Sequence, residues 1–208
     1  MKHLPNLLTG LRLALSLFVF LALAVVGGAW PGWRPDARAS AALEVWGFAA
    51  FVVAAVTDFF DGWLARRWGA VSVWGAILDP IADKVLICAA VLGLLALAAS
   101  PAIVIPAALI LFREFAVSAL REVTAGKGVS LPVTLLAKWK TTFQLVALGA
   151  ELIVAGWPAF GLPPAARAPA ALGAHALLWL AAAVTLLTGA QYLTQARRAL
   201  AVSTVDSP

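Results

Sequence analysis

The sequence predicts an all-α integral membrane protein built from six transmembrane helices. Of its 208 residues, 63% are hydrophobic and only 12% are charged, whereas soluble domains are about half apolar and a quarter charged. The apolar residues lie in runs of about 20, the length at which an α-helix crosses a bilayer. These runs use more than half of the chain, so we expect residues 1–208 to form a single membrane-embedded domain.

The first three apolar runs cover residues 13–29, 42 to beyond 56, and 76–99. The first run superficially resembles a signal peptide, but the polar stretch over residues 6–9 before it favours an uncleaved anchor. Proline and glycine in residues 30–35 predict a loop before the second helix. Carboxylates appear where the second helix ends and where the third begins.

The other three helices follow after further turn signals. Ser100 and Pro101 predict a tight turn, and Pro132 suits the first turn of a helix. Residues 156–169 are rich in proline and glycine and form the longest expected loop. The three helices are expected at residues 102–124, 132–155 and 172–195.

The cationic residues divide unequally between the two expected membrane faces. Arg34, Arg38 and Arg167 fall on one side, and the other 12 of the 15 Lys and Arg residues fall on or near the opposite side. Because cytoplasmic loops are enriched in Lys and Arg, we expect a multi-pass protein with both termini in the cytoplasm. The aspartates near the membrane lie on the same basic side, so their chemistry should be cytoplasmic.

The composition also argues against several classes of protein. Although the formal net charge is +5, no basic run or aromatic platform occurs in a soluble segment, so we do not expect nucleic acid as a partner. The single cysteine, Cys88, excludes an internal disulfide framework. Only Cys88, His3 and His175 offer the ligands that zinc prefers, so a bound metal should be held by oxygen.

Four aspartates at the second and third helices form the most informative pattern. Asp58 and Asp61 are three residues apart, and Asp79 and Asp83 are four apart, so each pair shares a helix face. In an antiparallel hairpin the two pairs meet at matched depth. A helix rises 1.5 Å per residue, so each pair is spaced by roughly 4.5 to 6 Å, which suits two metal ions ~4 Å apart.

Four clustered carboxylates near a membrane need a compensating positive charge, because each costs roughly 2.5 to 3.5 kcal/mol at the bilayer centre. Arg66, Arg67 and Lys84 are near in sequence but cannot chelate four acids as divalent cations can. Hard oxygen ligands favour two Mg²⁺ or Mn²⁺ ions with open positions for water or phosphate.

Small residues border these acids. Gly62, Ala65 and Gly75 lie near the aspartates on the two helices and leave room for a bulky group to approach the backbone. Arg66 can offer a fork of donors to a phosphate. The alternative is that the small residues permit close helix packing and that the aspartates form ion pairs.

Eight of these residues match a known signature in identity and spacing: Asp58, Asp61, Gly62, Ala65, Arg66, Gly75, Asp79 and Asp83. In this pattern the chain resembles the CDP-alcohol phosphatidyltransferase family. The resemblance implies a six-helix catalytic domain in which a hydroxyl group attacks the β-phosphorus of a CDP-linked lipid and CMP leaves. It also implies CDP-diacylglycerol as a substrate among the membrane lipids, a homodimer, and a place in the bacterial cytoplasmic (inner) membrane.

The resemblance further implies roles for the individual residues. Asp58, Asp61 and Asp79 correspond to metal ligands, and Asp83 to both a ligand and the general base. The residues that correspond to the CDP pocket are Gly62, Ala65, Arg66 and Gly75.

Three further stretches resemble the bacterial branch of the family that makes phosphatidylglycerophosphate. They are residues 5–12, the pair Arg113-Glu114 followed by Arg121, and Lys138 to Gln144. Asn6 and Thr9 in the first stretch have two equal interpretations, as CDP contacts or as a helix cap. Ala137 departs from the branch, which usually has glycine there.

A cluster of cations on the cytoplasmic side of the fourth and fifth helices suggests an anionic acceptor such as sn-glycerol 3-phosphate. Its members are Arg113, Arg121, Lys138 and Lys140. The related acceptors inositol phosphate and phosphatidylglycerol, the latter used by cardiolipin synthases, stay as alternatives. For the two lysines the positive-inside signal alone is a second explanation, and Glu114 can serve to orient an arginine.

The competing class is an ion or proton transporter, in which carboxylates within the membrane form a relay. Such relays spread through the membrane depth, and alternating-access folds show repeated halves. Here the acids gather toward one face and no internal repeat occurs. Outside the cluster, Glu44 and Glu151 are interpreted as interfacial or packing residues and His175 as a polar helix contact.

Overall fold

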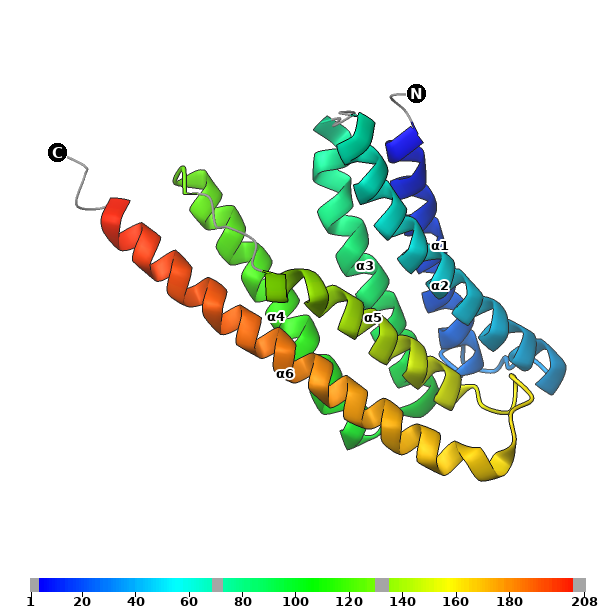
Figure 1. The fold of residues 1–208 in the computed structure, drawn as a ribbon. Helices are drawn as coiled ribbons and strands as arrows, with labels where there is room; N and C mark the ends of the chain where they lie inside the picture. The colour runs from blue at the N-terminus through cyan, green and yellow to red at the C-terminus, as the bar shows by residue number, and fades with distance from the viewer. Residues whose placement is uncertain (1–3, 69–72, 130–134, 204–208) are drawn as a thin grey trace.

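The computed structural model describes residues 4–68, 73–129 and 135–203. This part of the chain forms six α-helices and contains no strand (Figure 1). The predicted all-α class and the number of helices are therefore confirmed. The helices are α1 (Leu4–Val26), α2 (Ala37–Trp68), α3 (Val73–Ala98), α4 (Pro101–Gly126), α5 (Leu135–Ala155) and α6 (Pro164–Ser203).

Figure 1 shows that the helices alternate in direction and that both chain ends lie at the same end of the bundle. Helix α1 packs along α2 and α3, and α6 packs along α4 and α5. Fewer contacts join α3 to α4 and α5. Toward the end of the bundle that holds the termini, α4 and α6 diverge from α1 to α3 (Figure 1).

The starts of two helices differ most from the prediction. Helix α1 begins at Leu4 rather than at residue 13, and it contains polar residues that are buried inside the bundle, among them Arg12 and Ser16. Helix α6 begins at Pro164, so the predicted loop over residues 156–169 is shorter than expected. Proline is accepted in a first helical turn, and the alanine-rich sequence that follows favours continuing the helix past Pro169.

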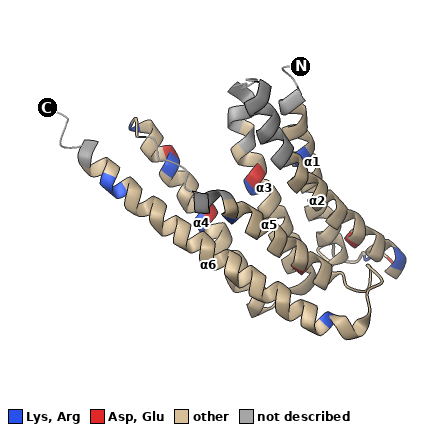
Figure 2. Ribbon diagram, in the orientation of Figure 1, with Lys and Arg blue, Asp and Glu red and all other residues tan. Residues whose placement is uncertain are grey.

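Five of the six helices are long and apolar enough to cross a membrane within the described residues, which fits a multi-pass membrane protein. Helix α5 is not among these five; it carries Lys138, Lys140 and Glu151 in 21 residues. Lys140 and Glu151 are buried, so α5 turns these charges toward the other helices. Figure 2 shows that charged positions are few and are separated by long uncharged stretches.

The core lies where the two groups of helices meet. Its fully buried side chains include Val19, Leu94, Leu148 and Leu178 from four different helices. Gly27 permits a close approach of α1 and α3, since a Cβ atom there would lie 2.5 Å from the carbonyl oxygen of Ala96. Large apolar side chains are also exposed, as expected for a surface that faces lipid, including Leu17, Phe112, Leu172 and Leu187.

Candidate active site

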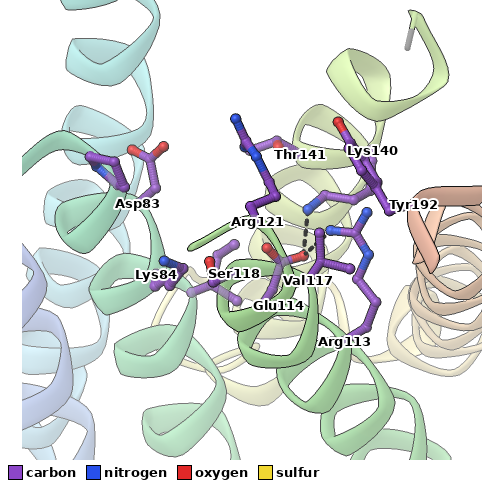
Figure 3. A pocket seen from close by; sticks show the side chains of 12 residues that line it. Asp83, Lys84, Arg113, Glu114, Val117, Ser118, Arg121, Lys140, Thr141 and Tyr192 are labelled. Carbon is purple, nitrogen blue, oxygen red and sulfur yellow. Dashed lines mark hydrogen bonds and ion pairs between the residues drawn. The ribbon is translucent and has the colours of Figure 1, made fainter. Parts of the chain in front are cut away.

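A polar cavity of about 190 Å³ lies among α3, α4, α5 and α6 (Figure 3). It is lined by Asp83 of α3 and by three of the four cations predicted to bind the acceptor phosphate, Arg113, Arg121 and Lys140. Figure 3 shows Asp83 across the cavity from these cations. The cavity thus joins the proposed base to the acceptor cluster, although 30 or more residues of chain separate them.

Asp83 is held by an arginine that the sequence analysis assigned to no role. The Nη1 atom of Arg12 donates a hydrogen bond to Oδ1 of Asp83 over 2.7 Å. The side chain of Arg12 is 1% exposed and that of Asp83 is 46% exposed. Arg12 therefore anchors the carboxylate from α1 while water and ligands can still reach it. A charged residue directly before the first apolar run was the signal that could have revealed this role.

Glu114 of α4 gathers three donors around one carboxylate oxygen. Its Oε1 atom accepts a short hydrogen bond from Nζ of Lys140 and a 3.1 Å hydrogen bond from Nε2 of Gln144. Nη1 of Arg113 lies 3.4 Å from the same oxygen (Figure 3). Glu114 thus pairs with Arg113 and Lys140, which fits the prediction that it can orient an arginine.

Helix α6 supports this cluster from the side opposite to Glu114. Nη2 of Arg113 donates to Oγ1 of Thr188 over 3.0 Å, and Nε2 of Gln144 donates to Oγ1 of Thr185 over 2.8 Å. The guanidinium of Arg113 also lies over the ring of Tyr192, 5.7 Å from its centroid. The sequence analysis missed these α6 residues, for which the only signal was a row of polar groups on one face of an apolar helix.

Gly189 makes room for Arg113 against α6. A Cβ atom at this position would lie 2.9 Å from Cγ of Arg113, closer than side chains tolerate. The arginine can therefore lie along the α6 backbone and reach Thr188 only because residue 189 has no side chain.

The remaining predicted residues are described in part. Helix α2 carries Asp58 and Asp61, and helix α3 carries Asp79 with Asp83, as predicted. Thr9 is buried on α1, five residues after the helix begins, so the interpretation of Thr9 as a helix cap is wrong. Several predicted site residues have side chains outside the described part of the structure: Asn6, Asp58, Asp61, Gly62, Ala65, Arg66, Gly75, Asp79 and Lys138.

The donor set of the expected metal site is consistent with a hard cation. The predicted ligands are all carboxylates, and α2 and α3, which carry them, contact each other. Asp83, the member whose side chain is described, opens into the polar cavity. Among the described side chains, no group of three or more His, Cys, Asp and Glu comes together.

Comparison with known proteins supports the family resemblance seen in the sequence. The sequence model of the CDP-alcohol phosphatidyltransferase family matches residues 2–187. Three bacterial relatives share the name CDP-diacylglycerol–glycerol-3-phosphate 3-phosphatidyltransferase. They come from Cereibacter sphaeroides (35% identical; 93% of this chain and 95% of the relative covered), Rickettsia bellii (38%; 95% and 97%) and Escherichia coli strain K12 (39%; 94% and 95%).

Proposed function

The chain belongs to the CDP-alcohol phosphatidyltransferase family, and we propose that it transfers the phosphatidyl group of CDP-diacylglycerol to sn-glycerol 3-phosphate. The products are phosphatidylglycerophosphate and CMP. The observation that carries this proposal is the cavity in which Asp83 faces Arg113, Arg121 and Lys140. The names of the relatives specify the same two substrates for those proteins.

In the proposed reaction, a hydroxyl oxygen of sn-glycerol 3-phosphate attacks the phosphorus that bears diacylglycerol. A new P–O bond forms, the P–O bond to CMP breaks, and CMP leaves with the electron pair. Asp83 accepts the hydroxyl proton, a role that its 46% exposure and its position in the cavity permit. Arg12 keeps the carboxylate directed from α3 toward the substrate by its 2.7 Å hydrogen bond.

The charge balance of the cavity favours an acceptor that is itself anionic. Four cationic side chains line it, Lys84, Arg113, Arg121 and Lys140, against the two carboxylates of Asp83 and Glu114. This leaves an excess of two positive charges, which matches a phosphate monoester of about −1.5 to −2 at neutral pH. A neutral alcohol would leave that excess uncompensated.

Asp58, Asp61, Asp79 and Asp83 are the residues that we propose to hold two Mg²⁺ or Mn²⁺ ions. Such ions would supply positive charge to the pyrophosphate and to the departing CMP. Gly62, Ala65 and Gly75 leave space beside these aspartates for the nucleotide, and Arg66 offers its guanidinium to a phosphate. Asn6 and Thr9 of α1 complete the proposed CDP pocket, and Lys138 the acceptor site.

The proposed active site faces the cytoplasm of a bacterial cell and lies at the level of the inner membrane. Arg121, which lines the cavity, is six residues before Lys127, and Lys138 and Lys140 come after the loop that follows. Cytoplasmic loops are enriched in Lys and Arg. From the family resemblance we also propose a homodimer. Each chain would carry its own cavity, because α3 to α6 of a single chain line it.

The test is an assay of CMP release from labelled CDP-diacylglycerol by the purified chain with Mg²⁺. We expect sn-glycerol 3-phosphate to be used far better than inositol phosphate, phosphatidylglycerol or plain glycerol. If inositol phosphate or phosphatidylglycerol outcompetes sn-glycerol 3-phosphate, the acceptor is wrong but the transfer reaction stands. If no acceptor gives CMP, the proposed function is wrong.

A further inference from the structure

A second cavity with polar residues lies away from the one that contains Asp83. It measures about 520 Å³ and is bounded by the end of α3, the start of α4, the end of α5 and the first turns of α6. Asp83 and Ala98 lie on the same helix, and a rise of 1.5 Å per residue separates them by roughly 22 Å along its axis. The two cavities therefore lie at different depths in the bundle.

Glu151 is the buried charge of this second cavity. Its side chain is 0% exposed, and its Oε1 atom lies 2.7 Å from Nδ1 of His175, which confirms His175 as a polar helix contact. The other oxygen, Oε2, is buried without a hydrogen-bond partner among the described residues. A buried carboxylate oxygen that lacks a donor is costly. This oxygen therefore calls for a donor from a ligand.

The other residues that line the second cavity indicate a ligand larger than a single ion. A volume of about 520 Å³ far exceeds the ~30 Å³ that one water molecule occupies. Ala98, Ala155 and Ala171 line much of the cavity and leave it open beside the backbone. Arg167, which is exposed, lies two turns before His175 on the same face of α6. A fitting ligand thus carries a cationic donor, an anion and an apolar part.

We propose that this cavity binds the headgroup of a phospholipid that carries a primary ammonium group. The ammonium donates to Oε2 of Glu151, and the phosphate pairs with the guanidinium of Arg167. A lipid is favoured over a soluble ligand because the outer face of α6 beside the cavity is apolar, with Leu172 73% exposed. A primary ammonium offers three N–H donors, whereas a quaternary ammonium offers none to the buried oxygen.

The experiment measures lipid retention by native mass spectrometry and thermal unfolding of the full chain purified in detergent. Phosphatidylethanolamine and phosphatidylcholine with identical acyl chains are titrated separately. We expect phosphatidylethanolamine to be retained and to raise the unfolding temperature by several degrees, and phosphatidylcholine to do neither. Glu151→Gln should weaken phosphatidylethanolamine binding by roughly tenfold or more, because it removes a charge-assisted hydrogen bond.

Two further variants make the result interpretable. Arg167→Ala changes an exposed residue, so it should fold normally and lose a similar part of the affinity. Glu44→Gln is the matched control, because Glu44 is a partly buried acid beside Gly156 that does not line this cavity. It should retain phosphatidylethanolamine as the parent protein does.

Three outcomes would overturn the proposal. They are equal binding of the two lipids, unchanged binding in both Glu151→Gln and Arg167→Ala, and equal stabilisation by soluble phosphoethanolamine or by Mg²⁺ alone. None of these measurements depends on CMP release. A failure here therefore leaves the proposed transfer reaction untouched, and a failure of that reaction leaves this site untouched.

Discussion

The proposed proton transfer depends on a single side chain, Asp83. Asp83→Asn keeps the size of the side chain but removes its basicity, so we expect kcat to fall by about 10² or more. Binding of CDP-diacylglycerol should change less. Single-turnover CMP release and equilibrium binding of CDP-diacylglycerol separate the two effects. Asp36→Asn is the control, because Asp36 is exposed and caps α2 through the N–H of Ala39, a bond that asparagine can keep.

Arg121 gives the cleanest test of the acceptor site, because it lines the cavity and is exposed. Loss of one charge-assisted hydrogen bond to phosphate costs roughly 1.5 to 3 kcal/mol, or about tenfold to more than a hundredfold in affinity. Arg121→Ala should therefore raise the KM for sn-glycerol 3-phosphate by that factor and leave the KM for CDP-diacylglycerol nearly unchanged.

Lys127→Ala is the matched control for Arg121→Ala, since Lys127 is an exposed cation just beyond the end of α4. Lys140→Ala is less suitable, because it also removes the closest partner of Glu114. If Arg121→Ala impairs CDP-diacylglycerol binding instead, the arginine serves the donor lipid and not the acceptor.

At the scale of the helices, Gly189 of α6 leaves the space that Arg113 occupies in the proposed acceptor site. Gly189→Ala places a methyl group 2.9 Å from Cγ of Arg113, so the arginine must leave Thr188 or shift its position. We expect a several-fold rise in the KM for sn-glycerol 3-phosphate. Gly173→Ala in the same helix meets nothing within 4 Å, gains the same helix propensity and should leave kinetics unchanged. Equal kinetics in both variants would contradict the role of Gly189.

The proposed metal ligands lie near the end of α2 and near the start of α3, and they should act together. We expect EDTA to abolish CMP release and Mg²⁺ or Mn²⁺ to restore it, because four carboxylates without cations repel one another. Asp79→Asn should raise the Mg²⁺ concentration needed for half-maximal activity. Both are measured by titrating the metal in the CMP assay. Full activity in the chelator would exclude the metal site.

The helices themselves were largely predictable, because each is a long apolar run between turn residues. The starts of α1 and α6 were not predictable, because α1 begins with polar residues and α6 with prolines. Whether such residues are buried in a helix depends on neighbours far away in sequence. Similarly, Asp83 and the cations were conspicuous as charges in apolar surroundings. Thr188 and Gly189 look ordinary in the sequence, and only the packing of α6 against Arg113 gives them a role.

For the whole molecule, buried charges are compensated at two separate places in the bundle. Glu114 pairs with Lys140 and Arg113 in the first cavity, and Glu151 pairs with His175 in the second. Because α5 supplies Lys140 to one place and Glu151 to the other, it connects the two. This division explains how Lys140 and Glu151, the two buried ionisable residues of α5, can pack inside an otherwise apolar bundle.

The orientation of the bundle in the membrane gives the last prediction. Lys127 directly follows the C-terminal end of α4, which bears Arg121. Arg38 lies in the first turn of α2, after the loop that joins the C-terminal end of α1 to α2. In a cysteine-free background made by Cys88→Ala, we expect Lys127→Cys to be protected from a membrane-impermeant thiol reagent in intact cells. Arg38→Cys should be labelled.

Permeabilised cells should label both positions, which controls for access to each thiol. This outcome follows because 12 of the 15 Lys and Arg residues lie on or near the Lys127 side and basic loops stay in the cytoplasm. Reversed labelling would place the Asp83 cavity on the outer face, away from cytoplasmic sn-glycerol 3-phosphate. The source of sn-glycerol 3-phosphate, as well as the orientation of the bundle, would then need another explanation.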